Sequence, residues 1–249
     1  MSLIIPMMKP VIVPASTGLK NVLVSCFGLN EASGSVAYDL HGSYDGANSN
    51  ISLQQTTVAN LQYSYGFNGS NSYVTLPYGI LPNISTSDFS VSLWFYTADT
   101  YTLQYLFDGA HRQTSGVSVY DGFAIRIYQD QMSLFFGNNS TSGLSVSNCG
   151  AITQSAWNHV LFTKSGTTVN LYVNGALTHT DNYTFHAAVS TGTLYTLGAL
   201  RRLANPTGLF FLNGKMDQVA TWNRELTGIG GEVTTLYSNG NGNPYTSWT

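Results

Sequence analysis

Short runs of alternating apolar and polar residues recur along most of the chain. The clearest run is FSVSLWFYT at Phe89–Thr97. Its first set of alternate residues is Phe89, Val91, Leu93 and Phe95, and the set between them is Ser90, Ser92, Trp94 and Tyr96. A period of two places successive side chains on opposite faces of a strand. The run therefore predicts a strand with the phenylalanine-bearing face toward a core.

Similar runs predict further strands, each separated from the next by Gly, Asn, Ser or Asp. These strands are Asn21–Phe27, Tyr63–Phe67, Ser72–Leu76, Leu103–Phe107, Gly122–Tyr128, Gln131–Phe136, Trp157–Lys164, Thr168–Val173, Leu194–Leu200, Leu209–Leu212 and Lys215–Trp222. Asn174-Gly175 predicts a two-residue hairpin turn, because both positions tolerate positive φ. Gly69 and Gly214 are also expected in tight turns. Only Glu225–Tyr237 has helical character, so the pattern predicts an all-β, antiparallel two-sheet jelly-roll sandwich.

The two ends of the chain differ from this pattern. Residues 1–20 are apolar and interrupted by Pro6, Pro10 and Pro14, which excludes a helix or a central strand. We expect an extended N-terminal arm that docks on its own domain or on a partner, since free apolar chain is unfavourable in water. Residues 21–240 form the predicted sandwich, and residues 241–249 a C-terminal tail.

The composition narrows the function. Charged residues make up 8% of the chain, against about 25% in a typical globular protein. With only nine Lys and Arg residues and a net charge of −3, no basic surface for nucleic acid is expected. No apolar run approaches the length of a membrane span. The N-terminus lacks a cationic start and a clear cleavage site, so we expect synthesis in a host cytoplasm without a signal peptide.

Cysteine and histidine give no sign of a reactive site. Cys26 and Cys149 lie far apart without a metal-binding spacing, which favours two buried thiols; a single disulfide is the alternative. His159 lies in the middle of a predicted strand, and we expect a packed, hydrogen-bonded side chain rather than a ligand or a base. Arg224 is expected to hydrogen-bond the chain as it leaves the last strand.

Five short motifs occur in an order that resembles the laminin-G-like, concanavalin A-like lectin family. They cover most of the sequence from Leu23 to Tyr237, and they are LVSCFGLNEASGSVAYDLHGSYDG (Leu23–Gly46), FNGSNSYVTLP (Phe67–Pro77), FSVSLWFY (Phe89–Tyr96), WNHVLFTKSGTTVNLYVNGAL (Trp157–Leu177) and LNGKMDQVATWNREL (Leu212–Leu226). The resemblance implies the same jelly-roll fold. It leaves the function open, because this fold carries lectins, hydrolases, adhesion modules and particle-surface proteins.

The sequence lacks the acidic pair that a glycanase of this fold would need. The chain has three glutamates, Glu31, Glu225 and Glu232, and none shares a predicted strand with a second carboxylate. Nucleophile and zinc motifs are also missing. We therefore expect a protein that is not an enzyme, with no catalytic residues; a glycoside hydrolase is the third alternative.

The family resemblance also implies a candidate calcium site. Relatives often hold one structural calcium between the opening Asp-containing loop and the strand that carries a Gly-x-Ile-Asp-Glu motif. The matching residues here are Asp39, Asp45 and Asp217, with Gln218 in place of the motif's glutamate. The alternative is that Asp39 and Asp45 cap turns and that Asp217 accepts backbone hydrogen bonds.

Two non-catalytic functions remain. The first is a free carbohydrate-binding module or adhesin that holds sugars on aromatic side chains. The candidate ligand-binding residues are Tyr101, Tyr105, Tyr120, Tyr245 and Trp248. The second, which we favour, is a bacteriophage virion-surface protein, such as a capsid decoration, head-fibre or tail component. Its arm would attach to a major capsid or tail protein, its sandwich could bind glycans, and a homo-oligomer, a trimer first, is expected.

Overall fold

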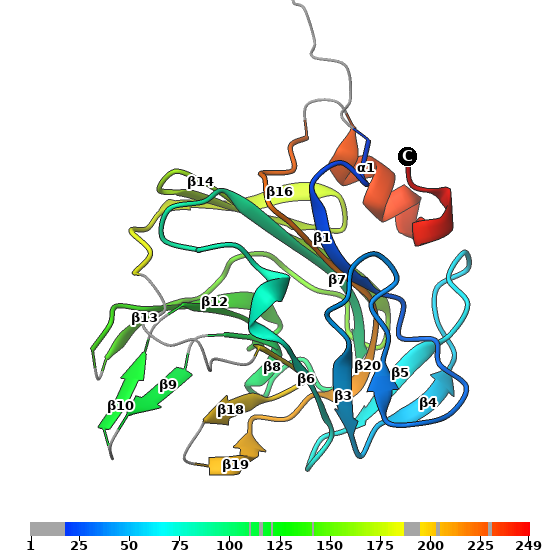
Figure 1. Cartoon of the computed structure of the whole chain (residues 1–249), viewed down its shortest axis with the longest axis horizontal. Coiled ribbons are helices and arrows are strands. Elements are labelled where there is room, and N and C mark those ends of the chain that lie inside the picture. The colour runs from blue at the N-terminus through cyan, green and yellow to red at the C-terminus, as the bar shows by residue number, and fades with distance from the viewer. Residues whose placement is uncertain are drawn as a thin grey trace, which may run out of the picture.

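The chain folds into two large antiparallel sheets packed face to face (Figure 1). The structure, a computed structural model, describes residues 18–109, 111–114, 117–120, 122–140, 142–186, 195–202, 205–228 and 231–249. Residues 1–17 of the predicted arm and the side chain of Tyr120 lie outside these described parts, so the docking predicted for residues 1–17 does too. Among the described residues, no helix combines the length and the apolar character that crossing a membrane requires.

The first sheet contains the strand predicted most clearly, β7, and the last strand, β20. In spatial order its strands are β16 (Ala176–Asn182), β15 (Thr168–Val173), β14 (Trp157–Ser165), β7 (Phe89–Thr97), β20 (Asn213–Trp222), β5 (Ser64–Asn68) and β4 (Ser52–Gln55). One further strand, β1 (Leu23–Phe27), pairs with the second half of β20. β5 and β1 thus pair with different halves of β20 on the same side of that strand.

The second sheet closes the other side of the core. In spatial order its strands are β13 (Gly143–Val146), β12 (Gln131–Gly137), β11 (Phe123–Tyr128), β8 (Gln104–Asp108), β17 (Tyr195–Leu197), β6 (Tyr73–Leu76), β3 (Gly46–Ser49) and β2 (Val36–Ala37). Two small hairpins lie outside both sheets, and their strands are β9 (His111–Thr114) with β10 (Val117–Tyr120) and β18 (Leu200–Arg202) with β19 (Asn205–Leu209).

The core between the sheets confirms the alternation seen in the sequence. Phe89, Val91, Leu93 and Phe95 of β7 all belong to the main apolar cluster. Phe162 of β14 stacks on Phe123 of β11 with ring centroids 4.8 Å apart, so aromatic rings join the two sheets directly. Burial of apolar side chains and offset aromatic packing of this kind supply most of the driving force for such a fold.

The opposite face of β7 is buried as well, which the alternation alone did not predict. Trp94 stacks on Tyr237, with ring centroids 5.8 Å apart, and is 1% exposed. Tyr237 ends the short helix α1 (Glu232–Tyr237), which lies on the outer side of this sheet beside β1 (Figure 1). Two short 3-10 turns follow α1 in the C-terminal segment, η2 (Ser238–Gly240) and η3 (Tyr245–Ser247), and a third, η1 (Tyr78–Ile80), lies in the loop after β6. The C-terminal segment therefore forms an additional layer.

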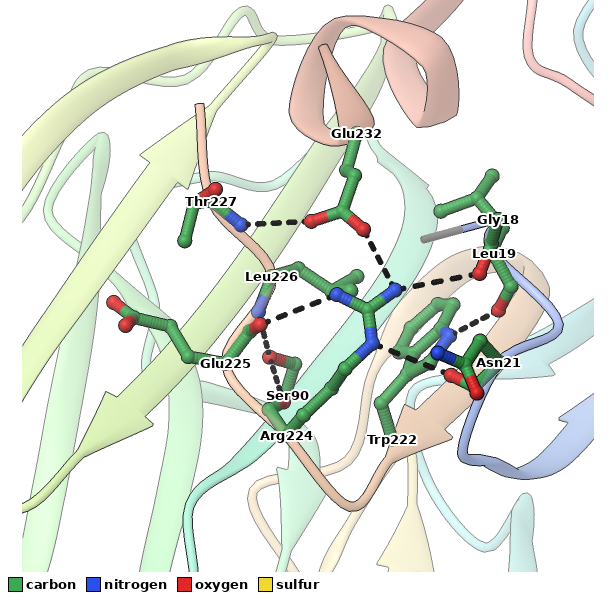
Figure 2. Close-up of polar contacts among 10 residues, drawn as sticks. All are labelled: Gly18, Leu19, Asn21, Ser90, Trp222, Arg224, Glu225, Leu226, Thr227 and Glu232. Atoms are coloured by element: carbon green, nitrogen blue, oxygen red, sulfur yellow. Dashed lines mark hydrogen bonds and ion pairs between the residues drawn. The ribbon is translucent and has the colours of Figure 1, made fainter. Parts of the chain in front are cut away.

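Arg224 fastens this additional layer to the sandwich (Figure 2). Its guanidinium forms an ion pair with Glu232 of α1 at 2.6 Å. It also donates to the backbone carbonyl groups of Asn21, at 3.2 Å, and of Gly18, at 3.4 Å. The expected role of Arg224 as a hydrogen-bond donor after the last strand is confirmed, and one side chain joins residues from both ends of the described chain.

A second apolar cluster stabilises the same layer. Trp222 of β20 is completely buried and donates its indole N–H to the carbonyl group of Leu19 at 2.6 Å. Trp248 packs on Trp222, with ring centroids 5.6 Å apart. Leu19 is also buried, so the last residues of the predicted arm, Gly18–Lys20, dock on their own domain. The predicted 241–249 tail is likewise packed onto the sandwich.

Several local predictions are confirmed and others are wrong. Asn174 and Gly175 adopt φ values of +51° and +81° between β15 and β16, as the hairpin prediction requires. Both cysteines are buried and free.

Gly214, in contrast, lies inside β20 rather than in a turn. A Cβ atom there would sit 2.0 Å from the backbone oxygen of Tyr96, so the close approach of β7 requires glycine. The helix predicted from Glu225 begins only at Glu232.

Candidate functional site

The candidate site begins at an irregularity in β20. This strand pairs with β5 from Asn213 to Met216 and with β1 from Val219 onward. Its pairing with β7 on the other side shifts register between Asp217 and Ala220. Gln218 has a φ of +42°, which is unusual for a residue with a side chain. The two residues at the fork between β5 and β1, Asp217 and Gln218, therefore form a β-bulge, a feature that often occurs beside functional sites.

The bulge changes which way the side chains of β20 face. Met216 and Val219 both belong to the core between the sheets, whereas Ala220 and Trp222 belong to the outer cluster. A regular strand would place only one residue between two core-facing positions, because its side chains alternate. The extra residue lets Asp217 and Gln218 line the same outer pocket.

We call this outer cavity the bulge pocket. Its volume is about 250 Å³. Its walls come from the chain after β1, the loop before β5, the bulge and the C-terminal segment, and the lining residues are Gly28, Asn30, Leu40, Asn60, Leu61, Gln62, Asp217, Gln218, Pro244, Tyr245 and Thr246. Four side-chain amides, one carboxyl and one aromatic ring thus surround a small concave space. Convergent polar groups on an apolar wall are the usual composition of a site for a small ligand.

Hydrogen bonds join two of the walls to each other. The backbone N–H of Asn60 donates to the carbonyl group of Asn241 at 2.9 Å. The side-chain amide of Asn60 donates to the carbonyl group of Gly242 at 3.0 Å. The loop before β5 and the C-terminal segment are therefore held together before any ligand arrives, which lowers the entropic cost of binding.

Asp217 lies at the bottom of the bulge and is 1% exposed. The hydroxyl group of Thr57 donates a hydrogen bond to its carboxyl group. Burial raises the pKa of Asp217 well above its usual range, and the nearby charge of Glu31 adds to this increase, against the hydrogen bonds from Thr57 and from the backbone of Gln218. Burial therefore favours the uncharged form of this carboxyl group.

Gln218 contributes an acceptor without a partner. Its Nε2 atom donates to the carbonyl group of Asn243 at 2.5 Å, which fixes the orientation of the amide. Its Oε1 atom is buried and has no hydrogen-bond partner in the described structure. A buried acceptor without a donor costs about 1–3 kcal/mol, and a ligand hydroxyl group would recover that energy.

The edge of the pocket is aromatic on the C-terminal side. The hydroxyl group of Tyr245 lies 3.2 Å from Nδ1 of His41. The ammonium group of Lys20 lies over the Tyr245 ring, 4.8 Å from its centroid. Burial raises the pKa of Tyr245, and the neighbouring Cys26 and Asp39 add to this effect. Tyr245 is therefore held in place as a wall of the pocket, with contacts on its ring and on its hydroxyl group.

Among the predicted ligand-binding aromatic residues whose side chains the structure describes, only Tyr245 lines the bulge pocket. Tyr101 is 64% exposed, in the loop between β7 and β8. The prediction is wrong for Tyr105 and Trp248, since these residues are only 3% and 4% exposed and are too buried to offer a ring face to a sugar. Tyr105 packs beside Phe210 and Arg126, and Trp248 packs on Trp222.

The acidic residues predicted to hold calcium are engaged in other contacts. Asp39 accepts hydrogen bonds from the backbone N–H groups of Cys26, His41 and Tyr44, at 2.9, 3.0 and 3.2 Å. Asp45 accepts one from the backbone of Asp39 at 2.9 Å. Across the described residues, no three His, Cys, Asp or Glu side chains gather into a group that could hold a metal. The contacts of Asp39 and Asp45 fit the turn-capping alternative.

The acidic residues near the bulge pocket are not arranged as a free catalytic pair. Glu31 is close enough to Asp217 to raise the pKa of that carboxyl group. Both of its oxygens are occupied, by the backbone N–H of Tyr38 at 2.7 Å and by the hydroxyl group of Tyr65 at 2.5 Å. Glu31 therefore supports the opening loop, and among the described residues that line the pocket Asp217 is the only acidic one.

Sequence reasoning missed most of the lining. Asn30, Asn60, Gln62 and Gln218 are amides in a chain rich in amides, and no spacing singles them out. Gln218 carried one signal, because it replaces the glutamate that the family motif has at this position. In the family motif this substitution is a departure from the calcium pattern, and in the structure it puts an uncharged amide in the pocket lining.

Solved structures of other proteins share the fold of this chain. A sialidase variant from Trypanosoma rangeli with trans-sialidase activity superposes with a TM-score of 0.63 at 18% identity, over 90% of this chain and 34% of the sialidase. The binding domain of botulinum neurotoxin serotype D gives 0.63 at 12% identity, over 88% of this chain and 52% of that domain. The binding domain of botulinum neurotoxin DC, solved in complex with SialylT, gives 0.62 at 12%, over 88% and 52%.

The chain thus spans about a third of the sialidase and about half of the toxin domains. At these identities the structural likeness shows the fold alone. No curated protein matches the sequence. The family model described as "Concanavalin A-like lectin/glucanases superfamily" matches residues 68–228, which is more than half of the chain. Together with the jelly-roll sandwich described above, this match shows that the chain belongs to the concanavalin A-like lectin/glucanase superfamily.

Proposed function

We propose that this protein is a non-catalytic, lectin-like surface component of a bacteriophage particle that binds glycans in the bulge pocket. The observation that carries the glycan-binding part is the lining of the pocket, where four amides, a carboxyl group and a tyrosine converge on about 250 Å³. Sugars are held in this way, by planar amides and carboxyl groups that bond to hydroxyl groups and by aromatic rings that contact the apolar C–H face.

The absence of catalysis is part of the same proposal. Glycoside hydrolysis needs two carboxyl groups on either side of the bond to be cleaved. In the described part of the chain, Asp217 is the only acidic residue in the lining, and both oxygens of Glu31 already accept hydrogen bonds. Binding without turnover is the chemistry that these side chains support.

A glycan array with the purified protein tests the binding site. Thr246 lines the pocket and is exposed, so Thr246→Trp places an indole against the cavity without removing a buried contact. We expect the wild type to bind a defined set of glycans and Thr246→Trp to lose about tenfold or more of that affinity. The matched control is Thr86→Trp, because Thr86 is also an exposed threonine and lies outside the lining. Equal loss in both variants, or no bound glycan, would contradict the proposal, as would release of a cleaved sugar.

The particle context rests on the sequence. The 8% charge content leaves Ser, Thr, Asn and Tyr to form the surface, and residues 1–20 are apolar and broken by proline. This composition suits a segment that attaches to a major capsid or tail protein, with the sandwich presented outward and a homotrimer as the favoured assembly.

Mass spectrometry of purified phage particles tests this context. We expect peptides of this chain in a fixed ratio to the major capsid protein. A high ratio is the result for a decoration or fibre subunit, and a low but reproducible ratio is the result for a tail component. Particles that contain no peptides of this chain would refute the virion role and leave the free lectin.

A further inference from the structure

We infer that the bulge pocket selects an uncharged sugar with hydroxyl donors and rejects acidic sugars. This inference rests on the glycan-binding function proposed above and adds the class of ligand. It follows from three properties of the described pocket, which are its unpaired acceptor, its charge and its size.

The unpaired acceptor is Oε1 of Gln218. The residue is 6% exposed and lines the pocket. Its amide cannot rotate by half a turn to hide this oxygen, because rotation would break the 2.5 Å bond from Nε2 to the carbonyl group of Asn243 and bring two oxygens together. Gln218 thus gives the pocket lining one acceptor without a donor, and a sugar hydroxyl group is the donor that we assign to it. A carboxylate group has no proton to give.

The charge of the pocket also disfavours an anion. Asp217 lines it, and no Lys, Arg or His is among the lining residues. Glu31 and Asp39 lie close behind the wall, and their negative charge contributes to the raised pKa values of Asp217 and Tyr245. The ammonium group of Lys20 lies over the Tyr245 ring rather than in the lining. A bound carboxylate would find no cationic partner among these lining residues and would lie near the negative charges of Glu31 and Asp39, and like charges cost the most where water is excluded.

The size restricts the ligand further. A volume of about 250 Å³ is smaller than the range of roughly 300–1,000 Å³ that is usual for drug-sized ligands. One terminal sugar ring therefore fits, with the remainder of a glycan outside beyond the exposed side chains of Leu40 and Thr246. The ligand class is a neutral hexose or N-acetylhexosamine at the end of a chain.

NMR titration with defined sugars tests the inference. The neutral probes are the methyl glycosides of galactose, mannose, glucose and N-acetylglucosamine, and the acidic probes are the methyl glycosides of glucuronic acid and N-acetylneuraminic acid. The test variant is Gln218→Met, which removes the acceptor at similar length. The matched control is Gln129→Met, since Gln129 also has a positive φ, of +52°, and lies exposed in the turn between β11 and β12. A second variant, Gln218→Asn, withdraws the oxygen and suits a positive φ if methionine disturbs the fold.

We expect at least one neutral glycoside to bind the wild type and Gln129→Met equally, and to bind Gln218→Met or Gln218→Asn about tenfold more weakly. The acidic probes should bind none of them. Acidic sugars that bind the wild type and are lost in the Gln218 variants would overturn the inference and leave the glycan site in place. Neutral binding that is unchanged in the Gln218 variants would also overturn it. If no sugar of either class binds, the proposed function itself fails.

Discussion

Replacement of Arg224 by methionine is expected to lower the free energy of unfolding by about 3–5 kcal/mol, the usual cost of leaving one partner of a buried ion pair alone. The side chains of Arg224 and Glu232 are 18% and 7% exposed, and their charges lie 2.6 Å apart. Methionine fills similar space but cannot neutralise the carboxylate. The variant also loses the hydrogen bonds to the carbonyl groups of Gly18 and Asn21. Denaturant unfolding at neutral pH measures the loss.

Two further variants separate the effect of breaking the ion pair from the effect of removing a positive charge. The double variant Arg224→Met/Glu232→Met leaves no charge unpaired and should recover at least half of the lost stability. Lys215→Met removes a half-buried cation that contacts the hydroxyl group of Thr56 and the ring of Tyr96, and it should cost about 1 kcal/mol or less. If Arg224→Met behaves like Lys215→Met, the guanidinium does not hold the C-terminal layer on the sandwich.

Acidification is expected to destabilise the protein through His159. This side chain is completely buried, and burial lowers its pKa from 6.5 to about 3. The unfolded chain therefore takes up a proton below about pH 6.5 while the folded protein does not. Stability is fully present above that pH and is lost as the pH falls, by roughly 1.4 kcal/mol per unit and about 2.7 kcal/mol in total by pH 4.5. Asp217 has a raised pKa and acts in the opposite direction, so only a comparison of variants isolates His159.

His159→Gln is the variant for this comparison, because glutamine keeps a polar group near Ser92 and does not titrate. The free energy of unfolding of the wild type minus that of His159→Gln should fall by about 2.7 kcal/mol between pH 7 and pH 4.5. Ser92→Ala is the control, since it removes the 2.8 Å contact to Nε2 but keeps the imidazole, and its pH dependence should follow the wild type. A constant difference between the wild type and His159→Gln would show that folding does not lower the pKa of His159.

The sequence predicted the sandwich well because alternation reports directly on strands. The core face of β7 and the turn at Asn174-Gly175 follow from side-chain period and backbone freedom, which are local properties. The burial of Trp94 on the other face does not, because it depends on α1, whose residues lie more than a hundred positions later in the chain. Gly214 illustrates the same limit, since its Cβ would collide with the backbone at Tyr96, on a neighbouring strand.

The candidate site was less accessible to sequence reasoning. Tyr245 was predicted as a ligand-binding residue and Asp217 as a calcium ligand, and both line the bulge pocket. Tyr105 and Trp248 were selected because aromatic residues hold sugars, but aromatic residues also build apolar clusters, and burial decided between these roles. The bulge itself cannot be recognised in the sequence. The segment Met-Asp-Gln-Val-Ala does not alternate regularly, and the end of a strand would break the alternation in the same way.

The extra residue in β20 also indicates how such a pocket can arise in a lineage. Without Gln218, Met216, Asp217, Val219 and Ala220 would alternate regularly between the inner and outer faces, and both apolar clusters would keep their residues. The difference between a plain strand and the strand that carries the pocket is one inserted codon. This wall of the pocket can therefore be gained or lost in a single genetic step, while the rest of the sandwich keeps its register.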